Sequence, residues 1–180
     1  MKNKEKVFVT AVTHFHHQNI IGFCDRPFRN VKDMNEKMVE NWNSVVSKNS
    51  KVFHLGDVSF GKQSDTKKIV QKLNGYKILI MGNHDEKHDI NWWQDCGFDE
   101  VYKYPIIYYK HIVMMHKPSE FYTSRTPYIW LYGHVHNTEM YSTITSSSAC
   151  MCVERWEYKP VELEYVMKLV NQKKTEVKIE

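Results

Sequence analysis

The sequence predicts an α/β fold with mixed β-sheets, and two observations carry that prediction. In the first half of the chain, short apolar runs rich in β-branched residues alternate with segments of helical periodicity. In the second half, strand-like runs follow one another closely, which favours mixed rather than purely parallel sheets. No internal repeat or linker interrupts the 180 residues, so a single domain over residues 1–180 is expected.

The expected strands are short runs of Val, Ile, Leu, Phe and Tyr. Those predicted to be buried strands are Val7–Val9, Val52–Leu55, Lys77–Met81, Ile112–Met115 and Tyr128–Tyr132. Further strands are expected over Val101–Tyr102, Ile106–Tyr109 and Tyr141–Thr145.

The expected helices show apolar residues at a spacing of three to four, which marks one face of a helix. The clearest pattern covers Val31–Val46, and a shorter one covers Ile69–Leu73, where Gly75 is placed to end the helix. A last helix is expected over Leu163–Val170, followed by a polar tail from about residue 171 or by a final short strand.

The composition argues against several classes of protein. A hydrophobic fraction of 42% indicates a packed core rather than disorder, and no run approaches the roughly 18 apolar residues of a membrane span. The formal charge of +4 is compatible with anionic substrates but does not indicate a nucleic-acid groove. The charged N-terminus has no signal-peptide core, so a cytoplasmic protein is expected. Buried or half-buried free thiols are expected for Cys24, Cys96, Cys150 and Cys152.

Side chains that can bind a metal come after five of the expected strands. Ligands of open α/β sheets bind outside the carboxyl ends of the strands, so these strand ends can converge on one spot. Imidazole nitrogens, a carboxylate and an amide oxygen together suit a borderline divalent metal. The residues at these ends are His14, Asp57, Asn83, His84, Asp85, His116, His134 and His136.

Each of these residues alone has an ordinary structural explanation. A single histidine at a strand end is most often a hydrogen-bonded structural residue, and Gly56-Asp57 is a common turn. The combination resists that explanation, because Gly82-Asn83-His84-Asp85 and Gly133-His134-Val135-His136 both follow apolar strands in one chain. A metal site is therefore the favoured interpretation.

The order of these motifs resembles that of the calcineurin-like metallophosphoesterase superfamily, in particular its small, capless bacterial and phage branch. The family pattern is Asp-x-His, Gly-Asp, Gly-Asn-His-Asp/Glu, a lone His and Gly-His-x-His. It reads here as Val12-Thr13-His14, Gly56-Asp57, Gly82-Asn83-His84-Asp85, His116 and Gly133-His134-Val135-His136. The resemblance extends over nearly the whole chain and implies a four-layer α/β/β/α sandwich of two mixed sheets flanked by helices.

The resemblance also implies two divalent metal ions and assigns their ligands. Asp57 would bridge both ions. The first metal would take His14, Asp57 and His136. The second metal would take Asp57, Asn83, His116 and His134. Manganese is the expected metal, with iron, zinc and nickel as alternatives.

The implied reaction is hydrolysis of a phosphate ester. Two cations about 3.5–4 Å apart clamp the phosphate and lower the pKa of a water, and the metal-bridging hydroxide attacks phosphorus. His84 would stabilise the transition state and protonate the leaving oxygen, and Asp85 would orient His84. Weaker candidates for substrate contacts are His17, Arg26, Lys117 and Arg125.

One position departs from the family pattern, because Val12 stands where family members carry a metal-binding aspartate. Valine has no lone pair, so the first metal would lose an anionic ligand. His16 is a candidate to reach into the gap. Three interpretations stay open: a disabled variant of an active enzyme, an active enzyme with a weak first metal, or a natural binding protein that kept the scaffold.

Functions of different classes therefore remain open. The first is an enzyme that hydrolyses a phosphodiester or a small nucleotide-type ester, since the chain is too short for a cap domain. The alternative is a pseudoenzyme that binds a phosphate or nucleotide ligand without turnover. A nuclease is less favoured, because it predicts a larger basic face. The segment Lys117–Tyr128, with Tyr122 and Arg125, offers stacking and charge beside the site.

Overall fold

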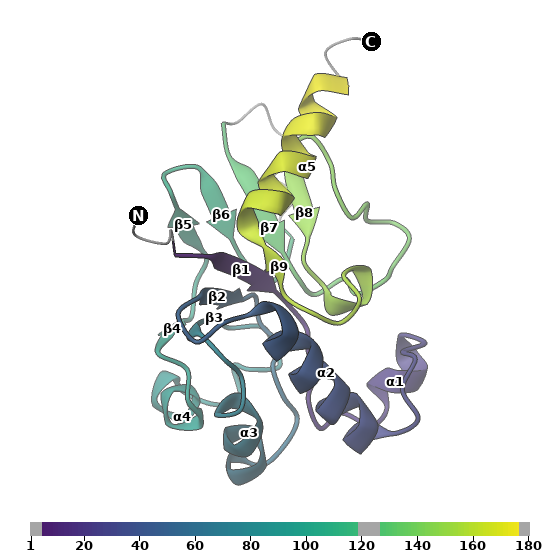
Figure 1. Ribbon diagram of the computed structural model, residues 1–180, viewed down its shortest axis with the longest axis vertical. Coiled ribbons are helices and arrows are strands. Elements are labelled where there is room, and N and C mark those ends of the chain that lie inside the picture. The colour runs from purple at the N-terminus through teal and green to yellow at the C-terminus, as the bar shows by residue number, and fades with distance from the viewer. Residues whose placement is uncertain (1–4, 119–126, 177–180) are drawn as a thin grey trace.

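A computed structural model, which describes residues 5–118 and 127–176, shows two β-sheets accompanied by helices (Figure 1). Among these residues, the first sheet has five strands in the order β4-β3-β2-β1-β9 and the second has four in the order β5-β6-β7-β8. The strands of the first sheet are β1 (Val7–Thr10), β2 (Lys51–His54), β3 (Tyr76–Ile80), β4 (Glu100–Tyr102) and β9 (Val161–Glu162). Those of the second are β5 (Ile106–Tyr108), β6 (Ile112–Met114), β7 (Ile129–Tyr132) and β8 (Ser148–Cys150).

Both sheets are mixed, as the sequence predicts. β1, β2, β3 and β4 pair in parallel, and β9 pairs antiparallel with β1. In the second sheet β6, β7 and β8 are parallel and β5 is antiparallel to β6. The carboxyl ends of β1, β2 and β3 therefore share one edge of the first sheet, and those of β6 and β7 share one edge of the second.

The helices are α1 (Ile20–Phe23), α2 (Val31–Val45), α3 (Gln63–Val70), α4 (Ile90–Cys96) and α5 (Leu163–Glu176), with a 3-10 turn over Val153–Arg155. The side chain of Asn30 caps α2 by accepting the amide hydrogen of Asp33, and Asp89 caps α4 by accepting that of Trp92. None of the helices in the described part of the chain combines the length and apolarity that a membrane crossing requires.

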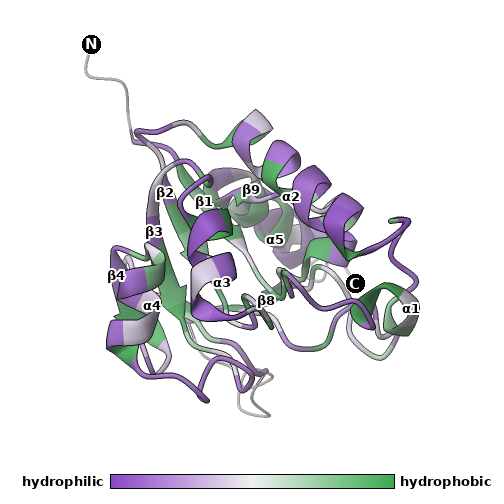
Figure 2. Ribbon diagram, turned by 90° about the horizontal axis from the view of Figure 1, so that it is seen from below, coloured by the Kyte–Doolittle hydropathy of each residue, from purple (hydrophilic) through white to green (hydrophobic). Residues whose placement is uncertain are grey.

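Alternation along the strands divides the core between two interfaces, because successive strand residues point to opposite faces. Phe8, Val52 and Leu79 pack in a cluster with residues of α2, α3 and α4. Val9 and Phe53 belong to a second cluster, which joins the first sheet to β6, β7 and α5. Figure 2 shows the apolar strands inside and the polar outer faces of the helices.

Several predicted elements are corrected by the structure. Tyr141–Thr145 is not a strand, because only Ile144 forms an isolated bridge, to Ala149. The Thr145 hydroxyl accepts the amide hydrogens of Ser147 and Ser148 in the turn that follows. The polar tail expected from about residue 171 is helical, since α5 continues to Glu176. The pattern at Ile69–Leu73 marks only the end of α3, whose first turns are polar.

Other elements were absent from the sequence prediction. α1, α4, β8 and β9 are short, and their apolar residues are too few to establish a period. The remaining predicted strands and the helix over Val31–Val46 are confirmed to within a few residues. The four cysteines are free and buried, as expected.

We predict that Leu131→Ala lowers the free energy of unfolding by about 2–5 kcal/mol, because Leu131 is fully buried between the sheets and alanine leaves a cavity. Chemical denaturation followed by circular dichroism measures this change. Tyr165→Ala is the control, since Tyr165 is 52% exposed and its loss should cost less than about 0.5 kcal/mol. Equal effects of the two substitutions would contradict the assigned core.

Candidate metal centre

The loops that follow β1, β2, β3, β6 and β7 bring the predicted ligands together. The Nε2 atom of His116 lies 3.0 Å from Asn83 Oδ1, 3.2 Å from His134 Nδ1 and 3.3 Å from Asp57 Oδ2. Ligand bonds of about 2.0–2.2 Å at right angles would separate neighbouring donor atoms by about 3 Å. These four residues, which sequence reasoning assigned to the second metal, thus have spacings that suit a common cation.

The protonation pattern of this group also suits a cation. His116 Nδ1 lies 2.8 Å from the carbonyl oxygen of Leu55, which can only accept, so Nδ1 carries a hydrogen, and Nε2, once it has lost its proton, offers a lone pair to the cluster. Burial alone would lower the pKa of His116, but the hydrogen bond and charge of Asp57 raise it. A bound proton thus offsets the Asp57 charge where a metal ion would otherwise do so.

His14 and His136 form the other half of the centre. His14 Nε2 lies 3.6 Å from Asp57 Oδ2, and the ring centroids of His14 and His136 are 5.0 Å apart. Both ring nitrogens of His14 are buried without a hydrogen-bond partner among the described residues. Burial lowers the pKa of His14 to about 2, so its ring is neutral and offers a lone pair. Unpaired buried nitrogens are costly, and a cation would satisfy one of them.

The close approach of the loops requires glycine at two positions. A Cβ atom on Gly56, which has φ of 80°, would collide with the backbone of Gly82 and with the His116 ring. A Cβ atom on Gly82 would collide with the carboxylate of Asp57. Glycine at these positions lets the ends of β2 and β3 approach closely enough for Asp57 and Asn83 to share one site.

Val12, which stands where an aspartate is expected from the sequence, is conformationally strained. It is fully buried and has φ of 54°, a left-handed conformation that is unusual for a β-branched residue. Asp57, His14, His134 and His136 also have positive φ values between 50° and 67°. Strained backbone of this kind clusters at functional sites. At position 12 an aspartate would fit the backbone better than valine.

Arg26 and Glu154 hold this strained loop in place. Arg26 donates to the carbonyl oxygens of Val12 and Thr13, each at 2.8 Å, and to Glu154 Oε1 at 2.6 and 3.1 Å. The Arg26 and Glu154 side chains are 0% and 3% exposed. This placement corrects the expectation that Arg26 contacts substrate, because its guanidinium is buried against the protein's own backbone.

Glu154 also reaches the histidine at the end of the last motif. His136 Nδ1 lies 2.8 Å from Glu154 Oε1, a contact that fixes the orientation of this candidate ligand. Burial alone would lower the pKa of His136, but hydrogen bonds to Cys24 and Glu154 raise it to about 9. The donor atoms of Cys24, His136 and Glu154 lie within 4.8 Å of one another, as do those of Asp57, His116 and His134. The cation on Arg26 opposes a metal in the first of these groups.

The predicted catalytic residues are placed in two different ways. The His84 ring meets that of His14 edge-on at 5.7 Å, and its backbone amide donates to Asp57 Oδ1 at 3.0 Å. Asp85 is fully buried, and its carboxylate accepts from the amides of Asp57, Val58 and Gly82 at 2.7–3.0 Å. This corrects the expectation that Asp85 orients the His84 ring. It fixes the loop backbone instead.

The weaker candidates are distributed around the centre. His17 lies beside His14, and their ring centroids are 5.6 Å apart. Lys117 is exposed. Burial lowers the pKa of His134, and the charge of Lys117 lowers it further. His16 does not fill the gap at Val12, because its ring is held by Asn35 and packs against Gly61. Tyr122 and Arg125 lie outside the described residues.

Sequence reasoning missed Glu154, Cys24 and Phe60 as neighbours of the centre. A usable signal existed for Glu154, because it follows the apolar run Ala149–Val153 just as the other polar residues follow their strands. That run was not recognised as containing a strand. Cys24 and Phe60 lie in loops without a periodic pattern, and no local signal identifies them.

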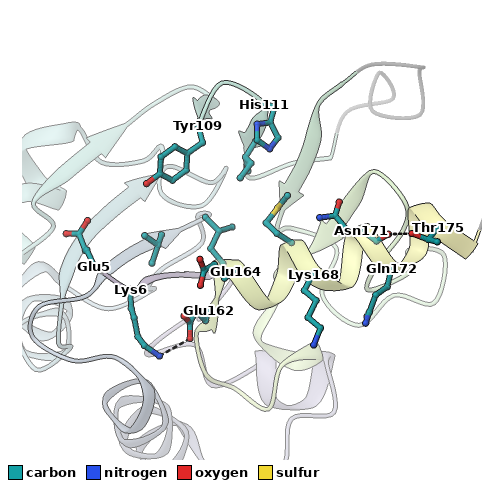
Figure 3. A pocket seen from close by; sticks show the side chains of 14 residues that line it. Glu5, Lys6, Tyr109, His111, Glu162, Glu164, Lys168, Asn171, Gln172 and Thr175 are labelled. Atoms are coloured by element: carbon teal, nitrogen blue, oxygen red, sulfur yellow. Dashed lines mark hydrogen bonds and ion pairs between the residues drawn. The ribbon is translucent and has the colours of Figure 1, made fainter. Parts of the chain in front are cut away.

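A separate cavity of about 1170 Å³ lies away from these residues (Figure 3). It is bounded by α5, the start of β1 and the turn between β5 and β6, and the side chains of Tyr109, His111 and Lys168 line it. None of the candidate metal ligands is among its lining residues. The volume of this cavity therefore does not bear on the chemistry of the centre.

We predict that Glu154→Gln lowers the free energy of unfolding by about 3–5 kcal/mol, because it leaves the buried Arg26 guanidinium without its counter-charge. The matched control is Asp33→Asn at the surface ion pair between Arg29 and Asp33, whose side chains are 84% and 15% exposed. This control should cost far less, because solvent screens an exposed ion pair. Urea denaturation of the two variants compares them, and similar losses would disprove the assigned role of the pair.

Comparisons with known proteins place the chain among relatives without assigning a function. No model of a known protein family matches it. A crystal structure of a protein of unknown function, AQ665 from Aquifex aeolicus, is similar with a TM-score of 0.69 and 27% identity, over 92% of this chain and 100% of that one. The uncharacterized protein MJ1445 of Methanocaldococcus jannaschii is 34% identical over 177 residues, which cover 94% of this chain and 93% of the relative. The chain therefore belongs to the same family as MJ1445.

Proposed function

We propose that the protein is a metal-dependent phosphoesterase of the calcineurin-like kind that hydrolyses a phosphodiester or a small nucleotide-type ester. One observation carries the proposal: residues from five separate motifs converge at the strand ends with the spacings of metal ligands. The two mixed sheets, with α2, α3 and α4 on one side and α5 packed near the second sheet, support assignment to the four-layer α/β/β/α sandwich.

The residues divide between two proposed metal positions that share Asp57. Asn83, His116 and His134 complete one position, and His14 and His136 complete the other. Two divalent ions held there, with manganese proposed first, would supply Lewis acidity to a phosphate and lower the pKa of a water. The chain's own part is to hold the ligands: Leu55 fixes the His116 tautomer and Glu154 fixes the His136 ring.

His84 is the proposed proton donor to the leaving oxygen. Its ring lies beside His14 rather than among the oxygen and nitrogen atoms that surround His116. Its backbone is anchored by Asp57, and Asp85 holds the neighbouring amides. An imidazole placed beside the ligands can stabilise charge on the phosphate and transfer a proton.

A second candidate function follows from Val12. Val12, whose carbonyl oxygen accepts from Arg26, places a buried apolar side chain where a carboxylate is expected. A protein with one strong metal position would bind a phosphate or nucleotide ligand without efficient turnover. The interpretations of an impaired enzyme and of a binding protein therefore make opposite predictions for the restored aspartate.

We predict that Val12→Asp raises manganese-dependent hydrolysis of bis-p-nitrophenyl phosphate by about 10–100-fold or more, because it restores an anionic ligand to the first position. Metal content measured on the same samples should approach two ions per chain. Release of p-nitrophenolate, followed by absorbance, gives the rate.

Two controls separate the causes of such a gain. Val12→Asn has the shape of aspartate and also tolerates the left-handed conformation, but it lacks the charge, so it should recover little activity. Asp57→Asn in the Val12→Asp background should abolish the gain. An absence of both metal and hydrolysis in the wild type and in Val12→Asp would exclude the phosphoesterase function. Metal binding without hydrolysis in either protein would favour the binding protein.

A further inference from the structure

We propose that Phe23 and His17 form a subsite for a flat aromatic group, the base of a nucleotide, beside the metal centre. This inference rests on the proposed phosphoesterase function and deepens it by naming the substrate class. It is carried by a series of rings that runs from a candidate metal ligand to the protein surface.

The series begins at His14. The ring centroid of His17 lies 5.6 Å from that of His14 and 4.1 Å from that of Phe60, to which it is nearly parallel at 12°. Phe23, the last residue of α1, meets the His17 ring edge-on at 6.3 Å and 65°. A substrate whose phosphate lies at the metal ligands therefore has aromatic surface next to it in one direction.

The rings in this series differ in how much surface remains free. Phe60 is covered by His17, by His84 at 4.9 Å and by Lys87, whose Nζ atom lies 4.8 Å from the ring centroid. Phe23 is 75% exposed. Phe23 thus offers an open face, whereas Phe60 supports the ring of His17 from within.

Exposure of one phenylalanine needs no explanation by itself. What distinguishes Phe23 is that its support is fixed to the metal centre. Ile20 of α1 is buried, and the Asn137 side chain donates to the Cys24 carbonyl at 3.1 Å, joining α1 to the loop that carries His134 and His136. α1 is the apolar helix at the side of the molecule in Figure 2.

The polar atoms nearby also suit a nucleotide. His17 Nδ1 is buried without a hydrogen-bond partner among the described residues, and a buried atom left unpaired in this way is costly. Lys87 places a positive charge over Phe60, where it favours an anionic phosphate. A stacking surface and a cation beside a phosphate position together match a nucleotide better than an alkyl phosphate.

The test is binding of AMP and of ribose 5-phosphate, which share the phosphate and sugar but differ in the base. Isothermal titration of the full chain with manganese should show tighter binding of AMP. Phe23→Ala should weaken AMP binding by about 5- to 150-fold, because base stacking on an aromatic side chain is lost. Binding of ribose 5-phosphate should not change, and Phe23→Trp should retain the preference for AMP.

The matched control is Tyr104→Ala, which removes an aromatic ring that is 73% exposed on the connection between β4 and β5. It should leave both affinities unchanged. Equal binding of the two ligands by the wild type, binding of neither, or an equal loss of both in Phe23→Ala would overturn the subsite.

Hydrolysis of methyl p-nitrophenyl phosphate, which has no base, distinguishes a failure of the subsite from a failure of the proposed phosphoesterase function. Turnover of this ester by the wild type or by Val12→Asp without a preference for AMP would remove the subsite and keep the phosphoesterase. A preference for AMP that depends on Phe23, without turnover by either protein, would remove the phosphoesterase and keep the subsite.

Discussion

The buried carboxylate of Asp85 is the interaction on which the geometry of the candidate metal centre most depends. It accepts hydrogen bonds from the amides of Asp57 and Val58 after β2 and of Gly82 after β3. Burial raises its pKa to about 6 although those backbone amides act in the opposite direction. An anion that is costly to bury is retained there because it joins two strand ends that would otherwise diverge.

A second buried charge does the same for the neighbouring loop. Arg26 binds the carbonyl oxygens of Val12 and Thr13, and Glu154 joins Arg26 to His136. Burial alone would raise the pKa of Glu154, but the hydrogen bond from His136 and the charge of Arg26 lower it. The left-handed backbone at Val12 is thus held by a buried ion pair, since such conformations do not persist without support.

These buried contacts also bear on Val12. The surrounding network forces position 12 into a conformation that valine tolerates poorly, while the side chain itself packs in the apolar core between the sheets. The backbone is therefore arranged as if for a small polar residue. Val12→Asp therefore tests whether the other proposed ligands, which lie close together, form a competent centre.

Much of the fold and most of the proposed ligand set could be predicted from the sequence, because both are local patterns. Apolar runs, either alternating with period two or continuous, predict β1, β2, β3, β6 and β7. The polar residues that follow these strands are the proposed ligands His14, Asp57, Asn83, His116 and His134. β8 and β9 were missed, because β8 contains no β-branched or aromatic residue and β9 has only two residues.

The sequence by itself determined which chemical groups stand at the strand ends, since each strand and the polar residues after it lie within a few positions of one another. Only the tertiary structure decided which buried side chains contact these groups. Arg26 and Glu154 are 128 residues apart in the chain, and Phe60 and His17 come from different loops. The contact between Arg26 and Glu154 depends on how the two sheets pack, and that between Phe60 and His17 depends on the pairing of β1 with β2. No spacing in the sequence records either arrangement.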